Sequence, residues 1–113
     1  MPEPGTTMLF CAQYWVEPDD VEVAMAKRLE FEEVRPDTLK VVCEYALHGK
    51  PPPYGGFMVV ETDDPAALNF LVIYFGKTVT FDIRACSDVV TTVAMTQEAL
   101  RARDAGAPAG ETD

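Results

Sequence analysis

The chain has 113 residues and 48% of them are hydrophobic, which is enough for one domain with a core and excludes global disorder. Its 19 acidic and 9 basic residues give a formal net charge of -10, which would repel phosphate backbones and anionic lipids, so nucleic acids and membranes are not expected partners. The longest apolar run, residues 70–76, is far shorter than the ~20 residues of a membrane span. Residues 1–7 lack the basic and apolar stretches of a signal peptide, so we expect a flexible leader and a cytoplasmic protein.

A strand over residues 8–15 is the first predicted element, and its two apolar faces are typical of a central strand. Pro18 and the acidic residues beside it then start a helix of about 14 residues. A second strand is expected over 39–48 and a third over 57–62. The connection between them, residues 49–56, is rich in Pro and Gly and favours neither helix nor strand.

The clearest local signal is Asp63-Asp64-Pro65, an Asp cap followed by Pro at the first helical position. It predicts a helix over 65–75, although the strand propensity of residues 70–75 supports a competing strand interpretation. One apolar stripe of this helix would cover the sheet. A second stripe is expected to meet another subunit and contains Phe70, Ile73 and Tyr74.

A fourth strand is predicted over 78–86, followed by an extra C-terminal helix from Val89 to Arg103 and a disordered tail over 104–113. The order of strands and helices predicts an α+β domain over residues 8–103. This is the ferredoxin-like split βαβ arrangement, a four-stranded antiparallel sheet with the first two helices of the chain on one face.

Alternation along the second and fourth strands assigns their side chains to two faces of the sheet. One set is apolar and would face the helices. The other set would face the open side of the sheet and contains Lys40, Val42, Glu44, Ala46, His48, Thr80, Asp82, Arg84 and Cys86. Because the first and third strands are apolar on both sides, an uncovered open face would expose a large apolar patch, so we predict at least a homodimer.

Two stretches carry a family resemblance, namely residues 8–18 and residues 56–64 with Ala66-Ala67-Leu68 after them. They resemble a bacterial domain family of unknown function that is similar to the dimeric α+β barrel proteins. The likeness covers about residues 8–90 and rests on structural motifs. It implies the fold and a dimer, whereas the wider superfamily includes cofactor-independent monooxygenases, haem-degrading enzymes, lactone isomerases and ligand-sensing regulators. The Pro-rich connection and the C-terminal helix depart from the shorter family pattern.

His48 is the only histidine and ends the second strand, where it is a candidate general base or haem ligand, or a strand-end residue without a role. Glu44 is expected on the same face but ~13 Å away by strand rise, too far for a hydrogen-bonded pair within one subunit.

Asp82 and Arg84 share a face at a predicted ~6.6 Å and would either bind a substrate carboxylate or form an ion pair. Gln13 and Trp15 would suit a flat ligand on the open face, or serve in core packing. Three cysteines without a C-x-x-C pair are expected to be reduced packing residues, and no metal site or cofactor is predicted.

Two functions remain open. The first is a small-molecule protein, for example a cofactor-independent oxygenase or isomerase for an apolar or aromatic substrate, with a cavity between sheet and helices lined by Gln13, Trp15, Glu44, His48, Asp82 and Arg84. The second is a non-catalytic accessory subunit that binds a protein partner through the helix 65–75 and the open sheet face. A cavity above ~300 Å³ with His48 at its wall would favour the first.

Overall fold

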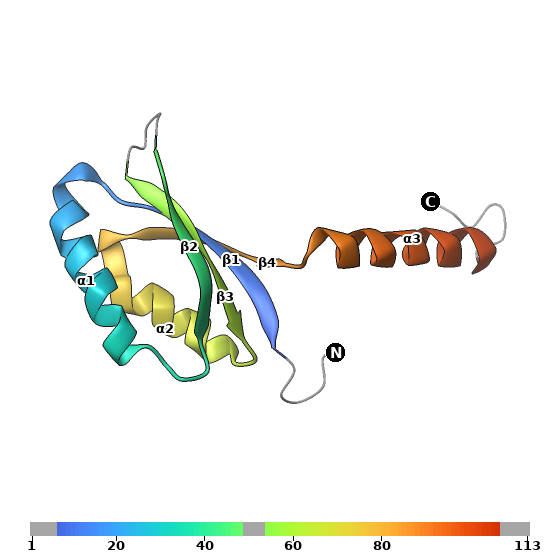
Figure 1. The fold of residues 1–113 in the computed structure, drawn as a ribbon, viewed down its shortest axis with the longest axis horizontal. Helices are drawn as coiled ribbons and strands as arrows, with labels where there is room; N and C mark the ends of the chain where they lie inside the picture. Colours follow the sequence, from blue (N-terminus) through green and yellow to red (C-terminus); the bar gives the residue numbers. More distant parts are fainter. Residues whose placement is uncertain (1–6, 49–53, 107–113) are drawn as a thin grey trace.

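Four strands form one antiparallel sheet in the order β2-β3-β1-β4. They are β1 (Met8–Trp15), β2 (Lys40–Leu47), β3 (Gly55–Thr62) and β4 (Thr80–Cys86). The structure is a computed structural model that describes residues 7–48 and 54–106. The helices α1 (Val21–Val34) and α2 (Pro65–Phe75) cover one face of the sheet, and α3 (Val89–Gly106) follows β4 away from it (Figure 1). The predicted ferredoxin-like split βαβ fold is confirmed.

Residues 65–75 form the helix α2 and not a strand. The cap at the start of this segment therefore outweighs the strand propensity of its apolar residues. Oδ1 of Asp64 accepts a hydrogen bond from the backbone N–H of Ala66 at 3.0 Å, and Pro65 occupies the first helical position. Gly76 ends the helix at a φ of 60°, a left-handed conformation that glycine adopts without strain. These local signals fix both ends of α2 at the predicted residues.

The core lies between the sheet and the two helices. Its buried cluster includes Met58 and Val60 from β3, Phe31 from α1 and Leu71 from α2. The ring of Phe31 lies 6.3 Å from that of Phe70 and 5.7 Å from that of Tyr74, measured between centroids.

The second apolar stripe of α2 is therefore covered in part by α1 of the same chain. Phe70 and Tyr74 are partly buried there, whereas Ile73 remains 68% exposed. Another subunit is not needed to cover the two rings.

A β-bulge in β2 reverses the faces predicted for the end of this strand. Val41 pairs with Val60, but Cys43 pairs with Val59, the very next residue of β3 in the ladder. An extra residue on one strand sends every later side chain to the opposite face. Glu44 consequently pairs with Met58 on the face that the helices cover.

The prediction that Glu44 and Ala46 point to the open face is therefore wrong, whereas His48 follows the last paired residue of β2 and has no ladder partner. Cys43, Tyr45 and Leu47 belong to the open face instead, in register with Val59, Phe57 and Gly55. The alternation of β4 has no such interruption: Asp82 pairs with Gln13 and Arg84 with Cys11 on the open face, as predicted.

The extra C-terminal helix is present as α3, and the side chain of Asp88 caps it by accepting from the backbone N–H of Thr91 at 2.7 Å. It continues to Gly106, three residues beyond the predicted end, and all of its residues are exposed. The predicted leader up to residue 6, the connection over 49–53 and the tail from 107 lie outside the described residues. No helix in the described part of the chain is long and apolar enough to cross a membrane.

Candidate functional site

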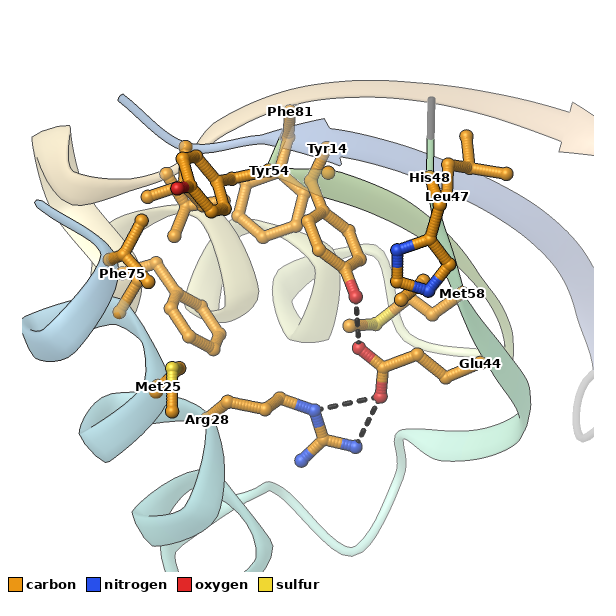
Figure 2. A pocket seen from close by; sticks show the side chains of 16 residues that line it. Tyr14, Met25, Arg28, Glu44, Leu47, His48, Tyr54, Met58, Phe75 and Phe81 are labelled. Carbon is orange, nitrogen blue, oxygen red and sulfur yellow. Dashed lines mark hydrogen bonds and ion pairs between the residues drawn. The ribbon is translucent and has the colours of Figure 1, made fainter. Parts of the chain in front are cut away.

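A cavity of about 350 Å³ lies between the sheet and α1. We call it the Tyr14 cavity. Its walls are largely apolar and include Val16, Val21, Ala24, Met25, Met58, Phe75, Val79 and Phe81. Its polar lining side chains are Tyr14 from β1, Arg28 from α1, Glu44 from β2, His48 after β2, and Tyr54 (Figure 2).

A chain of hydrogen bonds joins three of these polar groups. The hydroxyl of Tyr14 donates to Oε2 of Glu44 at 2.6 Å. Nε of Arg28 donates to Oε1 of the same carboxylate at 2.8 Å, and Nη2 forms an ion pair with this oxygen at 2.7 Å (Figure 2). Nη1 of Arg28 donates to Glu32, one helical turn further along α1, at 2.7 Å. The cluster is thus preorganised by contacts among β1, β2 and α1.

Glycine at position 56 lets Tyr14 reach Glu44 across the intervening strand β3. Tyr14 and Gly56 are paired in the ladder, so the phenol ring lies over the glycine. A Cβ at position 56 would lie 3.0 Å from the Tyr14 hydroxyl oxygen and 2.4 Å from the backbone oxygen of Tyr45. The absent side chain makes the space that this contact needs.

Burial and the Glu44 carboxylate fix the charge states of the neighbouring groups. Burial, followed by the hydrogen bond to Glu44, raises the pKa of Tyr14 well above its ordinary value. Burial opposes the charge of Arg28, but its hydrogen bonds to Glu44 and Glu32 outweigh this and raise its pKa. The hydrogen bond from Arg28 lowers the pKa of Glu32. At neutral pH Tyr14 therefore keeps its proton and Arg28 its charge.

A second cavity, of about 310 Å³, brings together three of the predicted site residues, Gln13, Trp15 and His48. Tyr14, Leu47, His48 and Gly55 line both this cavity and the Tyr14 cavity. His48 is exposed at the end of β2, so solvent reaches it. Of the predicted residues, Glu44 and His48 line the Tyr14 cavity, whereas Gln13 and Trp15 line only the second one.

Asp82 and Arg84 line neither cavity. They form an ion pair with each other along β4, with Nη2 of Arg84 3.4 Å from Oδ2 of Asp82, and the Arg84 side chain is 80% exposed. Such an exposed pair contributes little to stability. The structure places these two residues on the open face and separate from Glu44 and His48.

The comparisons with known proteins assign a family. The model of a family described as a domain of unknown function, DUF3303, matches residues 8–100. The chain belongs to this family. No curated protein is detectably similar to the chain.

Two solved structures resemble this DUF3303 domain. One is the "putative antibiotic biosynthesis monooxygenase" of Bacteroides thetaiotaomicron, 17% identical, covering 74% of this chain and 90% of that one, with a TM-score of 0.47. The other is SnoaB, a cofactor-independent oxygenase from Streptomyces nogalater, 15% identical, covering 73% of this chain and 92% of that one, with a TM-score of 0.42.

Three residues of the DUF3303 site escaped the sequence analysis, namely Tyr14, Arg28 and Gly56. The i, i+4 spacing of Arg28 and Glu32 is visible in the sequence and typical of a helical ion pair. Neither alternation nor spacing reveals the bulge that turns Glu44 toward Tyr14. Within the described residues, no group of three or more His, Cys, Asp or Glu side chains is arranged to hold a metal ion.

Proposed function

We propose that this DUF3303 domain binds an apolar, ring-containing small molecule in the Tyr14 cavity. The observation that carries the proposal is the combination of apolar walls with a preorganised polar cluster at one end. The volume of about 350 Å³ falls in the range of ligand pockets, and His48 lies at the wall. Apolar walls would supply the binding free energy, and the polar cluster would orient the molecule.

The activity we propose for this site is that of a cofactor-independent oxygenase, with molecular oxygen as the oxidant, or of an isomerase, acting on an apolar or aromatic substrate. His48 is the candidate proton carrier, because an imidazole can accept and return a proton near neutral pH. In an isomerisation the proton removed from one substrate atom returns to another, so no electron acceptor is required. Glu44 and Tyr14 would hold the substrate while the proton moves.

The binding proposal is tested by filling the cavity from α1. Ala24 is buried in its wall, whereas Ala26 on the same helix is exposed and does not line it. We expect Ala24→Met to lower affinity for a co-purifying ligand, identified by native mass spectrometry, by at least ~10-fold, since added methylenes occupy the ligand's volume. Ala26→Met should bind normally. Equal affinity of both variants, with unchanged melting temperatures, would contradict the proposal.

A second candidate function is that of an accessory or interaction subunit, and the uncovered open face favours it. Tyr45 on this face is 62% exposed, and Val42 and Leu47 are also exposed. The charged residues of the face cancel, because Lys40 is paired with Glu61 in the ladder and Arg84 forms an ion pair with Asp82 along β4. In a chain of net charge -10, a neutral apolar face is where a second copy meets least repulsion. We therefore propose a homodimer through this face, and the same face would serve a different protein partner.

A further inference from the structure

The Glu44 carboxylate at the polar end of the Tyr14 cavity presents lone pairs to a ligand. Oε1 of Glu44 accepts a hydrogen bond from Nε of Arg28 and forms an ion pair with Nη2, and Oε2 accepts a hydrogen bond from Tyr14. A carboxylate oxygen can accept a second hydrogen bond, so Oε2 retains capacity. The Tyr14 hydroxyl has committed its single hydrogen to Glu44 and offers only its oxygen lone pairs.

The charges around this end disfavour an anionic ligand. Among the described residues that line the cavity, Arg28 is the only permanent cation. Its Nε and Nη2 are engaged by Glu44 and its Nη1 by Glu32, so two carboxylates surround one guanidinium. A ligand carboxylate or phosphate would meet the partly buried Glu44 carboxylate at short range, where like charges repel.

We infer that the ligand of the Tyr14 cavity is an uncharged ring molecule with a hydroxyl group, which donates a hydrogen bond to Oε2 of Glu44 and excludes carboxylate- or phosphate-bearing analogues. This inference rests on the proposed binding function. The raised pKa of Tyr14 agrees with it, because the phenol keeps its proton on Glu44 and does not become a second anion. A ligand without a donor would leave the second lone pair of Oε2 without a hydrogen bond on a partly buried side chain.

Three probes that share one ring system separate these chemistries: 2-naphthol donates a hydrogen bond, 2-methoxynaphthalene does not, and 2-naphthoate is an anion. Binding of each to the full chain is measured by isothermal titration calorimetry at pH 7. We expect 2-naphthol to bind at least ~10-fold tighter than either of the others, the usual effect of one unpaired buried acceptor. Tightest binding of 2-naphthoate, or equal binding of 2-naphthol and 2-methoxynaphthalene, would overturn the inference while the binding function stands.

Two variants assign the preference to Glu44. Glu44→Gln keeps the side-chain shape but removes the charge, so we expect the preference for 2-naphthol over 2-naphthoate to fall several-fold. Glu32→Gln removes the same charge from the other partner of Arg28, outside the cavity lining, and should retain the preference for 2-naphthol over 2-methoxynaphthalene. Unchanged selectivity in Glu44→Gln would overturn the assignment. If none of the three probes binds the wild-type chain and no ligand co-purifies, the binding function itself fails.

Discussion

Tyr14 and Glu44 meet across an intervening strand, because the phenol of β1 passes over Gly56 of β3 to reach a carboxylate of β2 at 2.6 Å. The contact depends on two backbone features that lie apart from both residues. The bulge after Val41 turns Glu44 toward the helices, and the missing side chain at position 56 leaves room for the ring. The Tyr14 cavity is therefore a product of the sheet geometry.

Adding one methyl group at Gly56 should disturb this contact. The new Cβ would lie 2.4 Å from the backbone oxygen of Tyr45, so the β2–β3 pairing would have to shift. We expect Gly56→Ala to lower the free energy of unfolding by ~1–3 kcal/mol, measured by urea denaturation. Gly106→Ala is the matched control, because its Cβ would meet nothing within 4 Å. Equal stability of the two variants would show that β3 adapts without strain.

Alkaline pH should reveal the buried phenol of Tyr14. Its pKa is raised in the folded chain, so its contribution to stability is fully present below the ordinary tyrosine pKa of ~10 and is lost as the pH rises toward the folded value. Titration followed by tyrosinate absorbance should show Tyr14 ionising late. The hydrogen bond to Glu30 raises the pKa of Tyr74 to about 12, so Tyr74 also ionises late.

In the variant Tyr14→Phe, the rise in tyrosinate absorbance at the highest pH should disappear, and the rise due to Tyr74 should remain. The substitution should also make the free energy of unfolding less dependent on pH above the ordinary tyrosine pKa of ~10. A titration curve that merely loses an early-ionising tyrosine would contradict the burial of Tyr14.

Removing the Arg28 side-chain charge should lower the free energy of unfolding more than removing the charge of Glu32. Arg28 holds Glu44 in place with two nitrogens and is only 28% exposed, whereas Glu32 is 51% exposed. We expect Arg28→Met to lower the free energy of unfolding by ~1–3 kcal/mol, because Glu44 would lose its partner in a partly buried place. Glu32→Gln should cost less than ~1 kcal/mol. Equal losses in thermal denaturation would mean that Glu44 is solvated rather than held by Arg28.

The architecture could be predicted from the sequence because its signals are local. The Asp64-Pro65 cap and the glycine at position 76 define α2, and the apolar repeats define the strands. The site was only half predictable, since alternation assumes an unbroken ladder and the bulge in β2 breaks it. Glu44 and His48 were identified as candidates, but Glu44 was assigned to the wrong face, and its true neighbour Tyr14 was taken as part of an apolar strand.

The covering of α2 by α1 changes what a charge at Phe70 would do. Its ring packs toward Phe31 within the chain, so Phe70→Asp should destabilise the fold before it affects assembly.

A sharper test of the homodimer is Tyr45→Glu on the open face, with Val23→Glu on exposed α1 surface as the control. We expect light scattering to show a dimer for wild type and Val23→Glu, and a monomer of ~12 kDa for Tyr45→Glu.

The cysteines give an independent measure of the same interface. Cys11 and Cys86 lie on the open face with Cys43, and all three are unbonded thiols that are partly buried in the single chain. In a dimer through this face, alkylation by a bulky maleimide should be slow and should accelerate ~10-fold or more in Tyr45→Glu. Rapid alkylation of all three thiols in wild type would rule out an interface through this face.

His48 decides whether the DUF3303 domain catalyses a reaction or only binds. Because His48 is exposed at the end of β2, His48→Ala should leave the melting temperature nearly unchanged. If the imidazole carries the proton, this variant should turn over the co-purified ligand ~100-fold more slowly, the usual effect of a lost acid–base group, while calorimetric affinity changes little. The matched control Trp15→Phe alters the second cavity, which His48 also lines, without removing a titratable group. Full turnover in His48→Ala would exclude it as the proton carrier, and loss of turnover in both variants would instead indicate that the second cavity shapes the site.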